Sequence, residues 1–124
     1  MNIQEVLRLH KQWLALEEGG CYADLRNAIL CNADLGNADL RNANLCNANL
    51  RNANLRNANL HHADLHNAIL YDTDLSNADL RNAHLCSANL RNANLRNANL
   101  RNANLLYADL HNAILYDTDL SNAD

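Results

Sequence analysis

Leucine recurs at every fifth position of this 124-residue chain, from Leu25 to Leu120, without an interruption. Ala or Thr stands two residues before each of these leucines. A straight helix turns about 100° per residue, so a step of five would scatter the leucines around its circumference. A continuous strand alternates its faces with period two, so the same step would send successive leucines to opposite sides. The chain must therefore turn once in every five-residue unit.

Within each unit, one small and one large apolar residue face the same side. Ala53 and Leu55 are an example, because residues two apart share a side between turns. The residue between them and the two residues after Leu then point outward. The chain contains 24 Asn, a residue type that forms helices poorly and tolerates turns. A unit this small cannot bury its Leu alone, so we expect the units to stack and pair their backbones with those above and below.

The repeated unit resembles a known motif. Residues 53–57 read Ala-Asn-Leu-Arg-Asn and residues 78–82 read Ala-Asp-Leu-Arg-Asn, which is similar to the A(D/N)LXX motif of the pentapeptide-repeat family. The resemblance covers residues 21–124. It implies an all-β fold, a right-handed quadrilateral β-helix (a pentapeptide-repeat solenoid) with four pentapeptides per coil and about five coils.

On such a coil, residues twenty apart stack in columns. Asn37, Asn57, Asn77 and Asn97 then lie in register along one column. Stacked amide side chains can bond to one another in ladders. The outward Asn residues are therefore interpreted as structural.

The first twenty residues differ in kind. Ile3, Val6, Leu7, Trp13 and Leu14 give a roughly helical apolar stripe. The Gly pair at 19–20 is a natural helix stop. We predict a capping α-helix in residues 1–20 and a β-helix in 21–124, because a bare solenoid end exposes core leucines and strand edges. A membrane-binding or partner-binding amphipathic helix is the alternative, but the segment is short and only weakly basic.

No comparable cap is expected at the other end, where the sequence reaches Asn122-Ala123-Asp124 in the middle of a unit. Our hypothesis is an end-to-end homodimer through this uncapped C-terminal coil. The amino-terminal segment carries charges throughout, and no stretch approaches the ~20 apolar residues of a transmembrane helix. The sequence therefore predicts no signal peptide, no membrane partner and a cytoplasmic location.

The cysteines do not form a disulfide framework. On a twenty-residue coil, Cys46 and Cys86 share a column two layers apart, about 9.6 Å, which is beyond the reach of a disulfide. Cys21 and Cys31 have no cysteine in their columns. His66 lies between Cys46 and Cys86, but ligands about 2.0 to 2.3 Å from one ion cannot lie two layers apart on a stiff wall. We predict no metal and no cofactor.

Catalysis is not indicated by any motif. The chain has no nucleophile triad and no Gly-rich phosphate loop, and His61 and His62 are interpreted as solvated outward residues. An enzyme needs a concave pocket with convergent titratable groups, which a convex prism filled with Leu seldom provides. The prediction is a protein that is not an enzyme and has no catalytic residues.

The charges alternate from layer to layer. The net charge is -4, and it divides into -1 for residues 1–20, -2 for 21–40, +3 for 41–60, -4 for 61–80, +3 for 81–100, -2 for 101–120 and -1 for Asp124. Belts of opposite charge one strand apart are expected to pair across the ladder. Some members of the family protect DNA gyrase by resembling DNA, and this alternation weakens that reading. It also argues against direct nucleic-acid binding, since no aromatic series interleaves the Arg side chains.

Outward apolar residues break the polar pattern and form a possible protein-contact patch, namely Ile69, Tyr71, Leu106, Tyr107, Ile114 and Tyr116. Residues 61–79 recur as 106–124 after a spacing of 45, five more than two coils. The extra five residues place Ile114 and Tyr116 on a different wall from Ile69 and Tyr71. Duplication also explains these residues without selection for a site.

The preferred hypothesis is a non-enzymatic solenoid that acts as a rigid protein-interaction or scaffold element, with an unknown protein partner. The alternative is a DNA-mimicking regulator or protector of DNA gyrase or topoisomerase.

Overall fold

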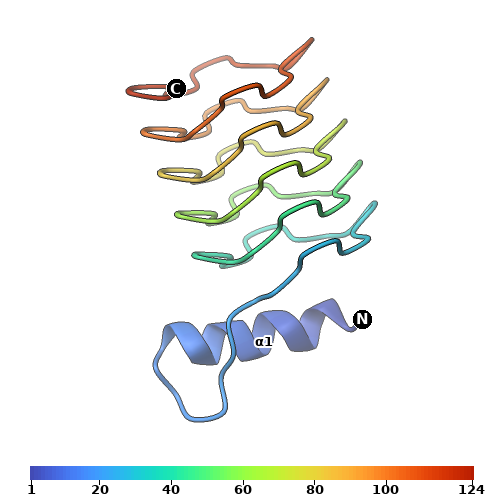
Figure 1. Ribbon diagram of the computed structural model, residues 1–124, viewed down its shortest axis with the longest axis vertical. Helices are drawn as coiled ribbons and strands as arrows, with labels where there is room; N and C mark the ends of the chain where they lie inside the picture. Colours follow the sequence, from blue (N-terminus) through green and yellow to red (C-terminus); the bar gives the residue numbers. More distant parts are fainter.

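The computed structural model describes residues 1–124. Figure 1 shows one helix, α1 (Ile3–Leu14), lying beneath a stack of circuits that rise toward the carboxyl end. Parallel backbone bridges join residues twenty apart, from Asp24 with Asn44 to Asn99 with Asp119. The fold is therefore a β-helix whose circuit takes twenty residues. Its bridges are isolated single-residue pairs rather than extended strands, because the chain turns in every unit.

Each unit closes on a tight turn. The N–H of Ala28 donates to the carbonyl oxygen of Leu25 at 3.1 Å, and the equivalent bond closes every later unit. The third residue of every turn is left-handed, with φ between 55° and 62°, and the second is not. This combination is that of a type II turn. Asn occupies fifteen of these twenty positions, because Asn tolerates the left-handed conformation better than most residues.

Hydrogen bonds between circuits satisfy most of the backbone N–H groups of each unit. In the interior of the rod, three of the five N–H groups of a unit donate to carbonyls of neighbouring circuits and one closes the turn. The fifth belongs to the residue after Leu, and the Asp or Asn before Leu accepts it. His66, for example, donates its N–H to Oδ1 of Asp64 at 3.1 Å. This local bond explains why Asp or Asn precedes Leu so regularly.

The bond is present in sixteen of the twenty units. The exceptions carry Ile or His in place of Asp or Asn, at Ile29, Ile69, His84 and Ile114. Neither side chain can accept this bond locally in the same way. The sequence thus departs from its own rule at four defined positions on the surface.

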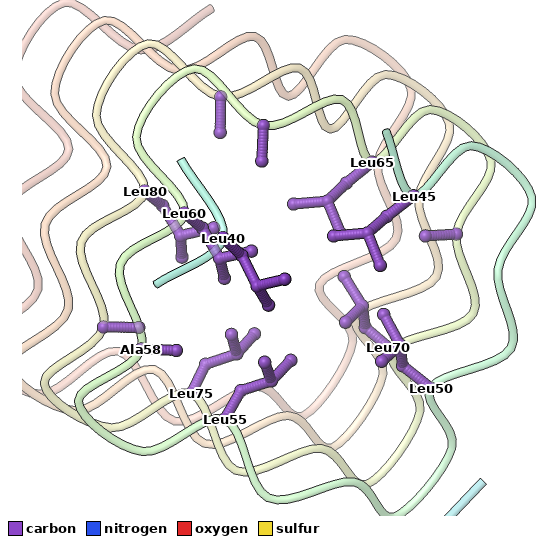
Figure 2. Packing of buried hydrophobic residues seen from close by; sticks show 14 of the residues in the cluster. Leu40, Leu45, Leu50, Leu55, Ala58, Leu60, Leu65, Leu70, Leu75 and Leu80 are labelled. Carbon is purple, nitrogen blue, oxygen red and sulfur yellow. The ribbon is translucent and has the colours of Figure 1, made fainter. Parts of the chain in front are cut away.

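The leucines fill the axis of the rod. Leu40, Leu60 and Leu80 stack in one column, and Leu55 lies beside Leu75 in another (Figure 2). Every repeat Leu from Leu25 to Leu100 is at most 4% exposed. Burying a Leu contributes about 1.5 to 3 kcal/mol, so this column packing is the main apolar source of stability.

The predicted Asn ladder forms only in part. Asn57 donates from Nδ2 to Oδ1 of Asn37 at 3.2 Å, but Asn77 and Asn97 make no such bond. These two amides instead line a polar hollow with arginine side chains. Three other cross-circuit amide bonds have Asp as the acceptor, as from Asn54 to Asp34 at 2.8 Å.

Helix α1 packs against the first circuit through one face. Ile3, Val6 and Leu7 contact the core cluster. Asn2 begins the helix by accepting the N–H groups of Gln4 and Glu5. The helix ends at Leu14, before the glycine pair that the sequence suggested as its stop. Gly20 allows the chain to pass close to the end of the helix, because a Cβ at this position would lie 2.3 Å from the backbone nitrogen of Trp13.

His10 is the one fully buried residue of α1, and the apolar stripe in the sequence does not include it. Its Nδ1 accepts the N–H of Ala23 at 2.9 Å, and its ring stacks on Trp13 with centroids 5.6 Å apart. Its Nε2 has no hydrogen-bond partner. Burial lowers the pKa of His10 below its ordinary value of 6.5, although the nearby backbone of Arg41 and the charge of Asp39 oppose the shift. The neutral ring therefore joins the helix to the rod.

Acidification is expected to weaken the docking of α1. A His whose pKa is lower in the folded state favours folding most above its unfolded pKa, about 6.5. The stability from His10 should decline as the pH falls from that value toward the folded pKa. Fluorescence of Trp13 and thermal unfolding between pH 7.5 and 5, values chosen to bracket the ordinary pKa of His, measure the effect. In His10→Gln the dependence should flatten, and an unchanged slope in that variant would contradict the assignment.

Candidate functional site

The predicted protein-contact residues lie in three separate pairs. Ile69 pairs through its backbone with Asn49 and Asn89, whereas Ile114 pairs with Asn94 in the next column of the rod. Leu106 and Tyr107 occupy a further corner, where the carbonyl of Leu106 accepts the N–H of Ser87. The structure therefore does not join the six residues into one patch.

Two of these pairs present the same local surface. The guanidinium of Arg51 lies over the ring of Tyr71, 5.3 Å from its centroid, and that of Arg96 lies over Tyr116 at 5.2 Å. In each case the Arg belongs to the circuit before that of the Tyr. A shallow hollow of about 280 Å³ is lined by Arg51, Ile69, Tyr71 and Asn89. Each Ile-Leu-Tyr unit thus offers an aliphatic side chain beside an aromatic ring that a cation holds in place.

The same units leave a backbone donor free. Because Ile69 and Ile114 replace the usual Asp or Asn, the N–H groups of Tyr71 and Tyr116 make no hydrogen bond within the protein. A typical hydrogen bond contributes about 0.5 to 1.5 kcal/mol. The two units therefore combine partly exposed apolar side chains with a backbone donor that has no partner in the protein.

One further apolar residue of this kind, Ile29, was not predicted from the sequence. Ile29 is 82% exposed and lies in the column of Ile69, two circuits below it. It borders a mostly apolar hollow of about 460 Å³ between the start of α1 and the first circuit, together with Met1, Ile3 and Cys31. Its signal was present in the sequence, because Ile29 breaks the Asp or Asn pattern in the same way as Ile69.

Most arginines of the rod are paired with aspartates. The shortest contacts lie within a unit and the longer ones between circuits, so the predicted cross-ladder pairing forms only in part. The pairs within a unit are Arg26–Asp24, Arg41–Asp39 and Arg81–Asp79, at 2.6 to 2.7 Å. The pairs between circuits are Arg56–Asp74, Arg91–Asp109 and Arg101–Asp119, at 3.7 to 4.0 Å. The hydrogen bond from Arg81 lowers the pKa of Asp79.

The thiols and imidazoles do not converge on one point. All four cysteines are free, and burial raises the pKa of the Cys46 thiol to about 11. His61 and His62 contact each other, with ring centroids 4.2 Å apart, and Asn82 lies 3.0 Å from Nε2 of His61. No group of three or more His, Cys, Asp or Glu side chains is arranged to hold a metal ion.

Comparison with known proteins identifies the repeat. The family model for pentapeptide repeats (8 copies) matches residues 22–45, 33–70, 68–105 and 93–124. The chain belongs to the pentapeptide-repeat family. No curated protein sequence matches it. The only helix of this pentapeptide-repeat protein is too short and too polar to cross a membrane.

Solved structures of the family are similar to it. HetL from the cyanobacterium Nostoc sp. strain PCC 7120, a protein involved in regulating heterocyst differentiation, is 43% identical with a TM-score of 0.54. The match covers 73% of this chain but only 39% of HetL. The protein alr5209 from Nostoc PCC 7120 is 35% identical with a TM-score of 0.51, and the match covers 90% of this chain and 92% of that one.

A more distant structure is QnrB1, a plasmid-mediated fluoroquinolone resistance protein. It is 19% identical over 84% of this chain and 65% of QnrB1, with a TM-score of 0.37. A likeness this low gives no indication of function.

Restoring the consensus residue should stabilise the rod. In Ile69→Asn the new side chain can accept the free N–H of Tyr71, so we expect the free energy of unfolding to rise by about 0.5 to 1 kcal/mol. Urea unfolding followed by circular dichroism measures the change. The reverse substitution, Asn89→Ile, removes the acceptor for Arg91 and should destabilise the protein by a similar amount. A decrease in stability for Ile69→Asn would contradict the role given to the Asp or Asn position.

Proposed function

We propose that this protein is a rigid, non-enzymatic interaction element. In this proposal it is a right-handed, four-sided rod of about five circuits, capped by α1, that holds contact groups at fixed spacing. The twenty-residue parallel pairing and the membership of the pentapeptide-repeat family support this architecture. A rod whose axis is filled with Leu exposes its side chains outward, so its chemistry lies on the walls.

The proposal rests on one observation: a unit that lacks a stabilising hydrogen bond carries apolar side chains at the surface instead. At Ile69 and Tyr71 the rod gives up a hydrogen bond that sixteen other units retain, and it presents an exposed Ile, a half-buried Tyr ring and an N–H donor without a partner. We propose these two residues, with Arg51 and Asn89, as the principal protein contact. The partner would place an apolar group against Ile69 and Tyr71 and a carbonyl or carboxylate toward the N–H and Arg51.

Substitution by the residues that the repeat itself prefers tests the contact. The double variant Ile69→Asn, Tyr71→Arg keeps the fold and removes the apolar surface, so it should lose the partner in a pull-down from the source cell. The matched control is Ile114→Asn, Tyr116→Arg on the neighbouring wall, which should retain it. Equal capture by the parent and both variants would exclude this contact.

The alternative, a DNA-mimicking regulator of gyrase, requires a predominantly negative surface. Here six arginines of the rod have aspartate partners, so acidic groups are neutralised locally. In the same series of experiments, a supercoiling assay with added protein should show neither inhibition of gyrase nor protection from its drugs. Inhibition by the parent protein would favour the alternative.

We also propose that two copies pack end to end through the last circuit. Leu115 and Leu120 are each 38% exposed there, in contrast to the fully buried leucines of the middle circuits. The carbonyl of Ala108 and the N–H of Leu110 lie on the same strand edge without partners. An antiparallel copy would bond to both groups reciprocally, so the edge is complementary to itself.

Light scattering tests this association. We expect the apparent mass to approach that of two chains as the concentration rises. A mass of one chain at every concentration would refute the end-to-end packing and would leave the side-wall contact unaffected.

A further inference from the structure

One wall of the rod carries a polar hollow of about 300 Å³ without a single apolar lining residue. Three successive circuits contribute to it. Its lining consists of Arg56, Asp74, Ser76, Asn77, Asn94, Arg96 and Asn97. Arg56, Ser76 and Arg96 lie twenty residues apart and therefore stack in one column, with Ser76 in the middle.

The hollow exists because the middle residue is small. At about 4.8 Å per circuit, the backbones that carry Arg56 and Arg96 are about 9.6 Å apart. Ser76 is only 7% exposed, since the neighbouring longer side chains stand above and below it. A hollow of this size lined by two arginine side chains suits a tetrahedral oxyanion.

Most hydrogen-bond donors around the hollow are unused. The amides of Asn77 and Asn97 and the hydroxyl of Ser76 make no hydrogen bond within the protein. Arg96 has no carboxylate partner, and it is held by the Tyr116 ring at 5.2 Å. Arg56 has only a long contact to Asp74, at 3.9 Å. Unpaired donors that surround one space favour an anionic ligand.

The other columns of the rod lack this arrangement. Arg51 and Arg91 have the same spacing, but the bulky Tyr71 stands between them and Arg51 lies over its ring. Arg41 and Arg81 are separated by His61, and each donates two hydrogen bonds to its own aspartate. Only at Ser76 do two arginines flank a small residue with their charges largely available.

Asp74 gives the hollow a preference among anions. Its carboxylate accepts the N–H of Ser76 at 3.0 Å and the Nδ2 amide of Asn94 at 3.3 Å, and it lines the hollow. With two Arg and one Asp, the lining has a net charge of +1. A carboxylate repels an anion that lacks a proton, but it can accept a hydrogen bond from hydrogen phosphate.

We propose that the hollow at Ser76 is a binding site for the phosphate group, either as free phosphate or as a phosphomonoester. Arg56 and Arg96 bind its oxygens from below and above, Ser76, Asn77 and Asn97 donate further hydrogen bonds, and Asp74 accepts the proton of the ligand. This site lies apart from Ile69 and Tyr71, so it does not depend on the proposed protein contact.

Titration of the ¹⁵N-labelled full chain with inorganic phosphate tests the site. The solution is kept at constant ionic strength with chloride. We expect saturable shifts of the side-chain amides of Asn77 and Asn97, and weaker binding of sulfate. Arg56→Gln and Arg96→Gln should each weaken phosphate binding roughly tenfold. The double variant Arg51→Gln, Arg91→Gln removes the same charge in the column blocked by Tyr71 and should bind phosphate like the parent.

Two further variants separate shape from charge. Ser76→Tyr should abolish phosphate binding without removing a charge, and Tyr71 is the natural precedent for a Tyr at such a place in the rod. Asp74→Asn keeps the acceptor for the N–H of Ser76 and should remove the preference for phosphate over sulfate. Thermal unfolding confirms that each variant is folded.

Titration with phosphoserine shows whether the site binds a phosphomonoester or only free phosphate. Binding as tight as that of inorganic phosphate would support the site with a phosphomonoester ligand, and exclusion of phosphoserine would support it with free phosphate. The absence of a saturable shift with phosphate would overturn the proposal. An equal loss of binding in the Arg51, Arg91 control would also overturn it, since a general charge effect would then explain the result. Equal binding of sulfate by the parent would refute the role of Asp74.

Discussion

Parallel backbone pairing between residues twenty apart is the constraint on which the rest of this protein depends. It sets each Leu directly above another, so that the cross-section of the core is repeated from circuit to circuit. It also consumes most of the backbone donors and acceptors, which leaves a rod with little freedom to rearrange. Outward side chains consequently occupy fixed columns, and the chemistry of a wall follows from which residues share a column.

The regularity of the backbone makes its exceptions informative. Asp or Asn before Leu binds the next free N–H, so a unit without it is less well bonded. Ile69 and Ile114 lack this bond beside Tyr71 and Tyr116, and His84 lacks it beside Cys86. In a chain of near-identical units, such departures are easier to interpret than they are in an irregular fold. They mark the four units in which the residue before Leu does not contribute to the hydrogen bonding of the rod.

The arginines of the rod differ in how closely they approach a carboxylate. Bidentate pairs within a unit, as between Arg41 and Asp39, neutralise both groups at short range. Arg56 and Arg96 are different, because their nearest available neighbours are a distant carboxylate and an aromatic ring. Net charge by layer, counted from the sequence, does not distinguish these cases. What distinguishes these cases is whether each arginine side chain is close enough to a carboxylate to pair with it.

The sequence by itself determined the turn in each unit, the inward Leu and Ala and the outward polar residues, because a strict period of five admits few backbone paths. It also placed Ile114 on a different wall from Ile69, since a spacing of 45 is not a multiple of twenty. Only the tertiary structure decided which hydrogen-bond donors have no partner within the protein. The burial of His10 against Ala23, the early end of α1 and the hollow at Ser76 depend on side chains from distant parts of the chain meeting in three dimensions. The period of the repeat determines which residues share a column. Which side chains touch across columns, or touch α1, depends on their size and length.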